Sequence, residues 1–266
     1  MKRIVPGLLI AAFWLFLVLY GPGLLFSAVV AVVVLIAADE YARMVDSRHL
    51  PPLERWGVNL LLAGPALAVC LLPRPVVLSG ALLLTLLAMT GYFLLRYKEL
   101  SDSFALFCRL VFGTVYIGFL GAHVLLLRGL PEGASWLIIA TAITAGSDSA
   151  AYFVGRAWGR RKLCPNISPN KTVEGALAGI AAGVVAAAFF ALLLLDEVHW
   201  PLLIFSAFFL GLIGIAGDLT ESIIKRGTGT KDSGSCLAGH GGILDRADSL
   251  LFVCPVLYYL LLFSVS

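Results

Sequence analysis

The sequence has few charged residues, and this scarcity excludes most classes of soluble protein. Charged side chains make up 13% of the 266 residues, whereas a soluble domain has about 25%. Hydrophobic residues make up 60%, and the mean hydropathy is +0.97. Because a water-soluble fold could not cover so much apolar surface, the expected solvent is the lipid bilayer. The net charge of +3 is not gathered in a dense basic patch, so nucleic acid is not an expected partner.

Several common sequence signals are also missing. The five cysteines show no CxxC or Cys/His spacing, so we interpret them as buried or free thiols rather than metal ligands. There is no Walker A sequence, so any phosphate site must be of another kind. The N-terminal apolar stretch has no clear small-residue cleavage site, and a cleavable signal peptide is therefore not expected. We find no internal repeat that would support an inverted-repeat transporter.

What the sequence does contain is long apolar runs, which predict an all-α, polytopic membrane protein with about nine transmembrane helices. Each span needs about 20 apolar residues. The predicted spans are 5–21, 22–40, 57–73, 75–95, 104–128, 134–154, 175–195, 200–220 and 248–265. The first and third are short, which leaves eight spans as an alternative.

The spans group into two regions. Residues 1–130 are expected to be N-terminal transmembrane helices, and residues 131–266 a C-terminal catalytic region. The catalytic region contains two long polar connections, 155–174 and 221–247. Loops of this length are not needed to join helices, and they suggest a site in a polar cavity.

The distribution of basic residues predicts the orientation. With nine spans, all but Arg74 and Arg128 of the 19 lysines and arginines fall on one side of the membrane. Positive charge marks the cytoplasmic side. The N-terminus and both long loops, with the active-site cavity, are therefore expected in the cytoplasm, and the C-terminus outside. The predicted location is the cell inner (cytoplasmic) membrane.

Acidic residues near the end of the eighth predicted span form the strongest chemical pattern. Asp218 and Glu221 are three residues apart, and Asp245 and Asp248 repeat this spacing at the start of the last span. On a helix, such neighbours share a face. Carboxylates at membrane depth need a polar cavity or a counter-charge, and Mg²⁺ prefers oxygen ligands. We predict that these four acids bind metal. The alternative is that they pair with Lys225, Arg226 or Arg246.

The loop between these acids is rich in glycine and basic residues. Glycine lets backbone amides approach an anion closely, and Lys225, Arg226 and Lys231 supply cationic donors for phosphate oxygens. The loop ends in Gly241 and Gly242, just before the last span, where a helix N-terminus favours negative charge. The neighbouring His240 could be a phosphate donor, a metal ligand or a turn residue.

A third pattern precedes these two. Asp148 lies within the sixth predicted span, where an unpaired carboxylate is improbable. Further along, Ser168 followed by Pro169 suits a helix N-cap and a first-turn proline, which would place Lys171 and Thr172 at the mouth of the seventh span. Ordinary capping with a snorkelling lysine is the alternative interpretation.

At these residues the sequence closely resembles the phosphatidate cytidylyltransferases, or CDP-diacylglycerol synthases. The upstream elements Asp-Ser-x-Ala-Tyr and Ile-Ser-Pro-x-Lys-Thr-x-Glu-Gly match, and Ala238 replaces a common proline. The matching signature consists of Ser222, Lys225, Arg226, Lys231, Asp232, His240, Gly241, Gly242, Asp245, Arg246 and Asp248.

The resemblance implies transfer of the cytidylyl group of CTP to phosphatidic acid, with Mg²⁺ and release of pyrophosphate. A second, monovalent cation and a homodimer remain open. Membrane lipids are the other expected partners. The implied catalytic residues are Lys225, Arg226, Lys231, Asp232, His240 and Arg246. The implied substrate-binding residues are Asp148, Tyr152, Ser168, Lys171, Thr172, Glu174, Ser222, Gly241 and Gly242. The predicted metal ligands are Asp218, Glu221, Asp245 and Asp248.

Two other functions stay open at this point. A CTP-dependent polyprenol or phytol kinase would use similar residues but release CDP, because it transfers the γ-phosphoryl group to an alcohol. A cation-coupled transporter could carry intramembrane acids, but it would not need glycines and basic residues gathered in one loop.

Overall fold

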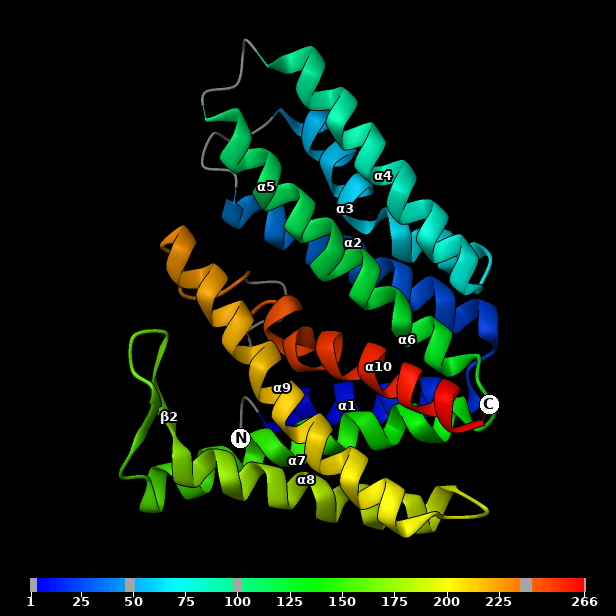
Figure 1. Cartoon of the computed structure of the whole chain (residues 1–266), viewed down its shortest axis with the longest axis vertical. Helices are drawn as coiled ribbons and strands as arrows, with labels where there is room; N and C mark the ends of the chain where they lie inside the picture. The colour runs from blue at the N-terminus through cyan, green and yellow to red at the C-terminus, as the bar shows by residue number, and fades with distance from the viewer. Residues whose placement is uncertain (1–3, 46–50, 98–101, 235–240, 266) are drawn as a thin grey trace. The chain divides into compact units, whose positions relative to one another are not determined.

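The computed structural model describes residues 4–45, 51–97, 102–234 and 241–265, and most of these lie in helices (Figure 1). The chain divides into two compact units. Unit 1 comprises residues 1–129 and 228–246, and unit 2 comprises residues 130–227 and 247–266. The described residues 228–234 and 241–246 thus belong to unit 1 together with the helices of residues 1–129.

Unit 1 is built mainly from helices that follow one another along the chain. They are α1 (Ile4–Tyr20), α2 (Gly23–Val45), α3 (Pro52–Leu71), α4 (Pro75–Arg96), α5 (Ser103–Gly113), the π-helical η1 (Thr114–Phe119) and α6 (Leu120–Arg128). The last three form one uninterrupted helical segment over the predicted span 104–128. Prolines occupy the first position of α3 and α4, where the missing N–H has no intrahelical partner to lose. Helix α3 packs against α2, α4 and η1.

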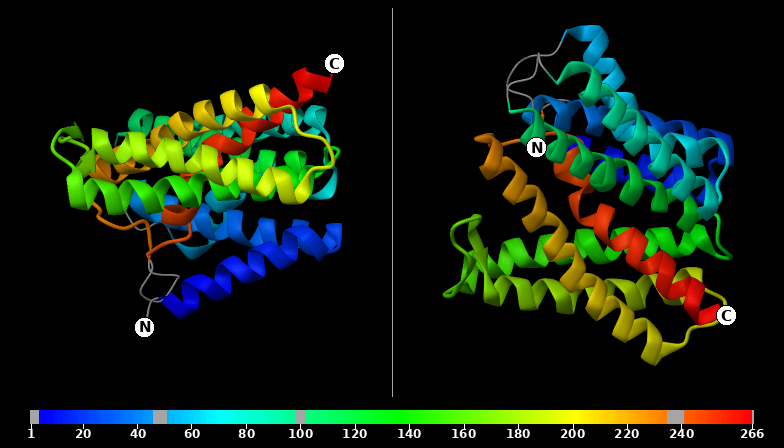
Figure 2. Two further views of the ribbon diagram at one scale, coloured as in Figure 1. Left: turned by 90° about the horizontal axis from the view of Figure 1, so that it is seen from below. Right: turned by 45° about the horizontal axis from the view of Figure 1, so that its top comes forward.

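Unit 2 combines long helices with one small β-hairpin. Its elements are α7 (Gly133–Trp158), β1 (Lys162–Cys164), β2 (Ser168–Thr172), α8 (Val173–Leu194), α9 (Trp200–Thr228) and α10 (Leu244–Val265). The end of α9 and the first turn of α10 belong to unit 1. The strands are antiparallel, with Lys162 opposite Thr172. The hairpin lies at one end of the α7–α8 pair (Figure 2).

Helices α7 and α8 approach closely because small residues line their contact. A Cβ added to Gly175 would lie 2.7 Å from the Ala151 carbonyl oxygen, and one added to Gly179 would lie 2.8 Å from that of Ser147. These distances leave no room for a side chain. The contact places Ser147 and Ala151 of α7 against the first turns of α8.

We expect Gly175→Ala to lower the thermal denaturation midpoint of the detergent-solubilised protein by about 5 °C, because overpacking costs about 1–3 kcal/mol. Thermal unfolding followed by intrinsic fluorescence would measure the change. Gly91→Ala in α4 is the matched control, since a Cβ there meets no atom within 4 Å. Equal midpoints for both variants would contradict close α7–α8 packing.

The helices agree with a polytopic membrane protein. Each predicted span falls on a described helix or helical segment. Among the described residues, seven segments are long and apolar enough to cross a membrane: α2, α4, the α5–α6 segment, α7, α8, α9 and α10. Helix α1 is shorter, and α3 is not among the seven. The fold class is therefore confirmed, while nine spans remain a prediction.

Two local predictions were wrong. Ser168 does not cap a helix, because Ser168–Thr172 is strand β2 and α8 begins only at Val173. The cap is Thr172, whose hydroxyl oxygen accepts a hydrogen bond from the Gly175 N–H. The predicted loop 221–247 also begins too early, because α9 continues to Thr228. Strand pairing with β1 accounts for the first difference.

Candidate active site

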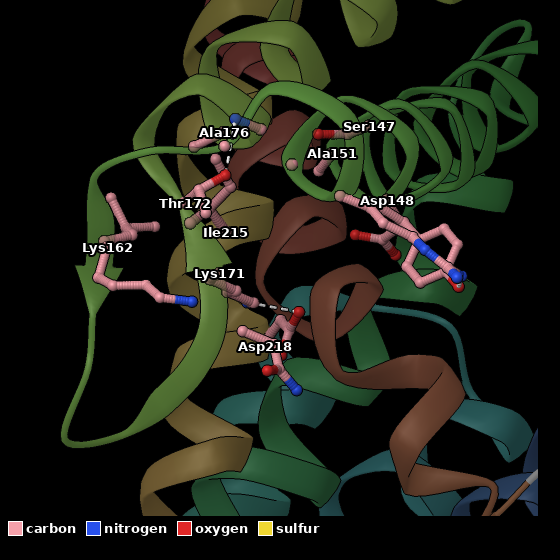
Figure 3. Close-up of a pocket in the computed structure, with 16 residues that line it drawn as sticks. Ser147, Asp148, Ala151, Lys162, Lys171, Thr172, Ala176, Ile215 and Asp218 are labelled. Atoms are coloured by element: carbon pink, nitrogen blue, oxygen red, sulfur yellow. Dashed lines mark hydrogen bonds and ion pairs between the residues drawn. The ribbon is translucent and has the colours of Figure 1, made fainter.

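A pocket of about 550 Å³ opens in unit 2 among α7, the hairpin, α8 and α9 (Figure 3). Its volume lies in the usual range for small-molecule sites. Five of the predicted site residues line it: Asp148, Tyr152, Lys171, Thr172 and Asp218. The structure thus brings residues from three separate segments of the chain, on α7, β2 and α9, into one cavity.

Lys171 and Asp218 form an ion pair inside this pocket. The Lys171 Nζ lies 2.5 Å from Asp218 Oδ2, and the two side chains are 25% and 30% exposed. Partly exposed ion pairs add little to stability. The pair instead fixes a cation and a carboxylate beside each other at the pocket wall, where phosphate and metal chemistry would need both.

Asp248 lies close to Asp218 because α9 and α10 are in contact. A Cβ on Gly217 would lie 2.7 Å from the Asp248 carbonyl oxygen, and the Ser249 hydroxyl donates a hydrogen bond of 3.1 Å to the Gly214 carbonyl. Asp248 is only 7% exposed, and its Oδ1 accepts the Ser249 N–H at 2.6 Å.

Two of the three charged side chains that act on Asp248 are acidic. Its carboxylate interacts electrostatically with those of Asp218 and Asp148, and with the ammonium group of Lys171. Carboxylate oxygens gathered in this way are ligands that suit a hard cation. Nevertheless, across the described ranges, no three His, Cys, Asp or Glu side chains form a group that could by itself hold a metal ion.

The end of α9 directs its charged residues to other partners. Glu221 is 1% exposed, and its Oε2 lies 2.8 Å from Lys225 Nζ, one helical turn away. Arg226 Nε donates to the Ile167 carbonyl at 3.2 Å, which connects α9 to the hairpin turn. The pairing of acid with lysine that was left open as an alternative is therefore present for Glu221.

Two of the predicted substrate-binding residues, Glu174 and Tyr152, contact other residues of unit 2. The Glu174 carboxylate accepts the backbone N–H groups of Arg160 and Arg161 at 3.0 and 3.2 Å, and so anchors the start of the hairpin. Glu174 and Ser168 are not among the residues lining the pocket. The Tyr152 hydroxyl accepts a 3.0 Å hydrogen bond from Arg156 at the pocket wall.

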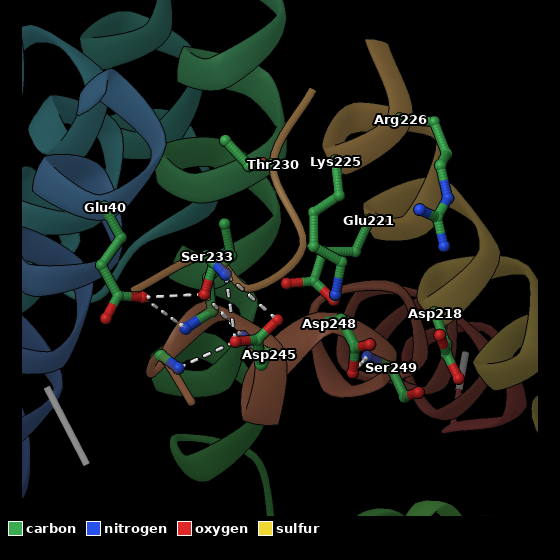
Figure 4. Close-up of polar contacts among 12 residues, drawn as sticks. Glu40, Asp218, Glu221, Lys225, Arg226, Thr230, Ser233, Asp245, Asp248 and Ser249 are labelled. Carbon is green, nitrogen blue, oxygen red and sulfur yellow. Dashed lines mark hydrogen bonds and ion pairs between the residues drawn. The ribbon is translucent and has the colours of Figure 1, made fainter. Parts of the chain in front are cut away.

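In unit 1, the glycine-rich loop binds carboxylates of the chain itself. The N–H groups of Ser233 and Gly242 donate to Asp245 Oδ2 at 3.1 and 2.8 Å (Figure 4). Gly241 has φ +82°, a left-handed conformation that favours glycine. The N–H groups of Ile243 and Leu244 donate to Glu40 at 3.1 and 3.0 Å. These four amides thus already have anionic acceptors.

The remaining predicted residues are exposed or half-buried. Lys231, Asp232 and Arg246 are exposed in unit 1, and Ser222 is half-buried on α9. His240 lies outside the described residues.

The sequence patterns missed several pocket and loop residues. Arg156, Lys162 and Asn170 line the pocket and add polar groups to it. All three stand close to the motifs in sequence, which was the available signal. Glu40 and Ser233 were also missed, although an Asp-Glu pair ending an apolar run was a visible anomaly at Glu40.

Fold and site together define a class: a multi-span helical membrane protein with a polar pocket where carboxylates and basic groups meet. The comparison with known proteins identifies the family. The model of the cytidylyltransferase family matches residues 1–264, so the chain belongs to this family.

Individual relatives agree with this assignment. The chain is 38% identical to the phosphatidate cytidylyltransferase of Bacillus subtilis (strain 168), covering 99% of this chain and 98% of that protein. It is 39% identical to the phosphatidate cytidylyltransferase of Staphylococcus saprophyticus over 67% of this chain and 68% of that protein. It is also 34% identical to the uncharacterized protein YnbB of Escherichia coli (strain K12) over 91% of this chain and 81% of that protein.

Proposed function

We propose that this protein transfers the cytidylyl group of CTP to phosphatidic acid, giving CDP-diacylglycerol and pyrophosphate. The observation that carries the proposal is the near full-length similarity to the Bacillus subtilis phosphatidate cytidylyltransferase. The unit 2 pocket supports it, because it combines Lys171, Arg156 and Lys162 with acidic groups. Basic groups bind phosphate oxygens, and carboxylates suit the cation that accompanies a nucleotide triphosphate.

The chemistry needs no protein nucleophile. An oxygen of the phosphatidate phosphate attacks the α-phosphorus of CTP and forms a new P–O bond. The bond from that phosphorus to the α–β bridging oxygen of CTP breaks, and pyrophosphate leaves with this oxygen and the electron pair of the broken bond. Catalysis then consists of positioning and charge neutralisation. Lys171 would neutralise phosphate charge, and the Asp218 carboxylate beside it would keep its ammonium group oriented.

Magnesium remains part of the proposal. Asp218 and Asp248 on neighbouring helices, with Asp148 in electrostatic reach, offer the hard oxygen donors that Mg²⁺ prefers. Mg²⁺ usually takes one or two carboxylates and completes its shell with water and substrate phosphates, so a ready-made cage is not required. When bound, it would stabilise the charge on the departing pyrophosphate. Of the other two predicted ligands, Glu221 is paired with Lys225, and Asp245 accepts the N–H groups of Ser233 and Gly242.

The deciding experiment is an assay of purified protein with CTP labelled in the cytosine base, phosphatidic acid and Mg²⁺. We expect label to enter the lipid phase, with one pyrophosphate released per labelled lipid. Release of CDP without labelled lipid would instead indicate a CTP-dependent lipid kinase. No nucleotide turnover would contradict the proposed function and leave transport to be tested.

We further propose that the protein resides in the inner (cytoplasmic) membrane with its N-terminus and both long connections in the cytoplasm and its C-terminus outside. The uneven distribution of lysine and arginine supports this orientation. CTP is a cytoplasmic substrate, which requires the same side. A homodimer, implied by the family resemblance, stays a prediction.

Single cysteines test this orientation. In a background without the five native cysteines, Asn166→Cys and Thr230→Cys are expected to react with an impermeant maleimide only after the membrane is opened. Glu197→Cys, in the connection between α8 and α9, should react in intact cells and serves as the opposite-side control. Labelling of either loop position in intact cells would overturn the proposed orientation.

A further inference from the structure

Glu40, in the part of the chain with no expected role beyond spanning, has an unusual environment in unit 1. It lies near the end of α2 and is 5% exposed. Its carboxylate accepts three hydrogen bonds: from the Ile243 N–H at 3.1 Å, the Leu244 N–H at 3.0 Å and the Ser233 hydroxyl at 3.2 Å. A buried carboxylate is tolerated only when it is satisfied in this way. Glu40 therefore occupies the anion-binding N-terminus of α10.

The glycines of the loop are fitted to this carboxylate. A Cβ added to Gly234 would lie 2.4 Å from Glu40 Oε1, and one added to Gly242 would lie 2.5 Å from Glu40 Oε2. Atoms cannot approach this closely without displacement. Part of the glycine content that suggested phosphate binding is thus explained by close packing around Glu40.

Ser233 connects Glu40 to Asp245. Its hydroxyl donates to Glu40 and accepts the Asp245 N–H at 3.3 Å, while its own N–H donates to the Asp245 carboxylate at 3.1 Å. Figure 4 shows Ser233 between the two acids. Movement of Glu40 would release the Ser233 hydroxyl, which accepts the Asp245 N–H. If Ser233 then shifts, its own N–H also loses the Asp245 carboxylate.

We propose that Glu40 is a positioning residue for the transfer reaction, acting through Ser233 to fix Asp245 and the first turn of α10. This role rests on the proposed function, because Asp245 matters as part of the cytidylyltransferase signature. Glu40 contacts neither nucleotide nor lipid in this role. Its removal would leave two helix N-terminal amides and a hydroxyl without their anionic acceptor.

The neighbouring Asp39 supplies a matched control on the same helix. Its carboxylate contacts Arg43 at 2.7 Å, Arg55 at 3.3 Å and Asn59 at 2.9 Å, and these residues lie on α2 and α3. Asp39 thus joins helices, whereas Glu40 binds the loop. Equivalent amide substitutions at the two positions remove the same charge from adjacent residues.

The test compares Glu40→Gln with Asp39→Asn. Glutamine keeps the volume and one acceptor oxygen, so the fold should persist. We expect Glu40→Gln to lower kcat about five- to twentyfold with the KM for CTP within about twofold. Hydrogen–deuterium exchange of the amides of residues 241–246 should become faster. Asp39→Asn should leave kcat and this exchange unchanged. Unchanged kcat and exchange in Glu40→Gln would overturn the proposal.

A double-mutant cycle with Ser233→Ala separates positioning from general stability. If Glu40 acts through Ser233, the double variant Glu40→Gln/Ser233→Ala should lose clearly less kcat than the product of the single losses. If the loss of kcat in the double variant equals the product of the two single losses, Glu40 does not act through Ser233. An inactive wild-type protein would contradict the proposed function instead, and the exchange measurement would then still decide whether Glu40 holds the start of α10.

Discussion

Asp248→Asn is expected to reduce turnover by more than about a hundredfold without unfolding the protein. The carboxylate is 7% exposed and lies in the electrostatic field of Asp218 and Asp148, where a cation is favoured. Asparagine is isosteric and keeps an oxygen for the Ser249 N–H, so the local fold should survive. What it removes is one negative charge from the proposed metal site, and loss of even an outer-shell metal contact costs ten- to a hundredfold.

The measurement is kcat as a function of Mg²⁺ concentration, together with the thermal denaturation midpoint. Asp218→Asn should behave similarly, because both carboxylates come from the α9–α10 contact. Asp196→Asn is the control: Asp196 is an exposed acid in the connection between α8 and α9, and its replacement should be silent. Near-normal kcat of Asp248→Asn at limiting Mg²⁺ would remove Asp248 from the proposed metal site.

Lys171→Ala has the second largest expected effect, a loss of about ten- to a hundredfold in kcat/KM. A charge-assisted hydrogen bond contributes about 1.5–3 kcal/mol, and about 1.4 kcal/mol corresponds to a factor of ten. The substitution also leaves Asp218 without its 2.5 Å partner in the pocket. Lys171→Arg keeps the charge and should retain more activity than Lys171→Ala.

Kinetics with both substrates subsaturating would measure this loss. A rise in the KM for phosphatidic acid alone would assign Lys171 to the lipid phosphate, whereas a fall in kcat would assign it to charge that develops on pyrophosphate. Arg74→Ala, in the connection between α3 and α4, removes a positive charge far from the motifs in sequence and should have no effect. Full activity of Lys171→Ala would exclude the hairpin from the active site.

The hairpin shows where a local signal was ambiguous. Ser168-Pro169 satisfies the rules for a helix start, yet these residues form β2 because β1 is available to pair with them. The observed N-cap is Thr172, four residues after the predicted one, and its hydroxyl can cap a helix as a serine hydroxyl does. Lys171 lies near the start of α8 in both cases: it would have been in the first turn of the predicted helix, and it lies two residues before the observed one. It therefore lines the pocket in spite of the wrong prediction.

The sequence by itself determined the membrane class, the approximate bounds of the helices and the family, because apolar runs and motif spacing are local properties of the chain. It also indicated that Asp148, Lys171 and Asp218 belong to one site. Only the tertiary structure decided which partners the charged groups take. Glu221 pairs within its own helix, whereas Glu40 meets Ser233 from 193 positions away. A contact between residues so far apart in the sequence depends on how α2 packs against the loop, and the periodicity of the sequence does not predict it.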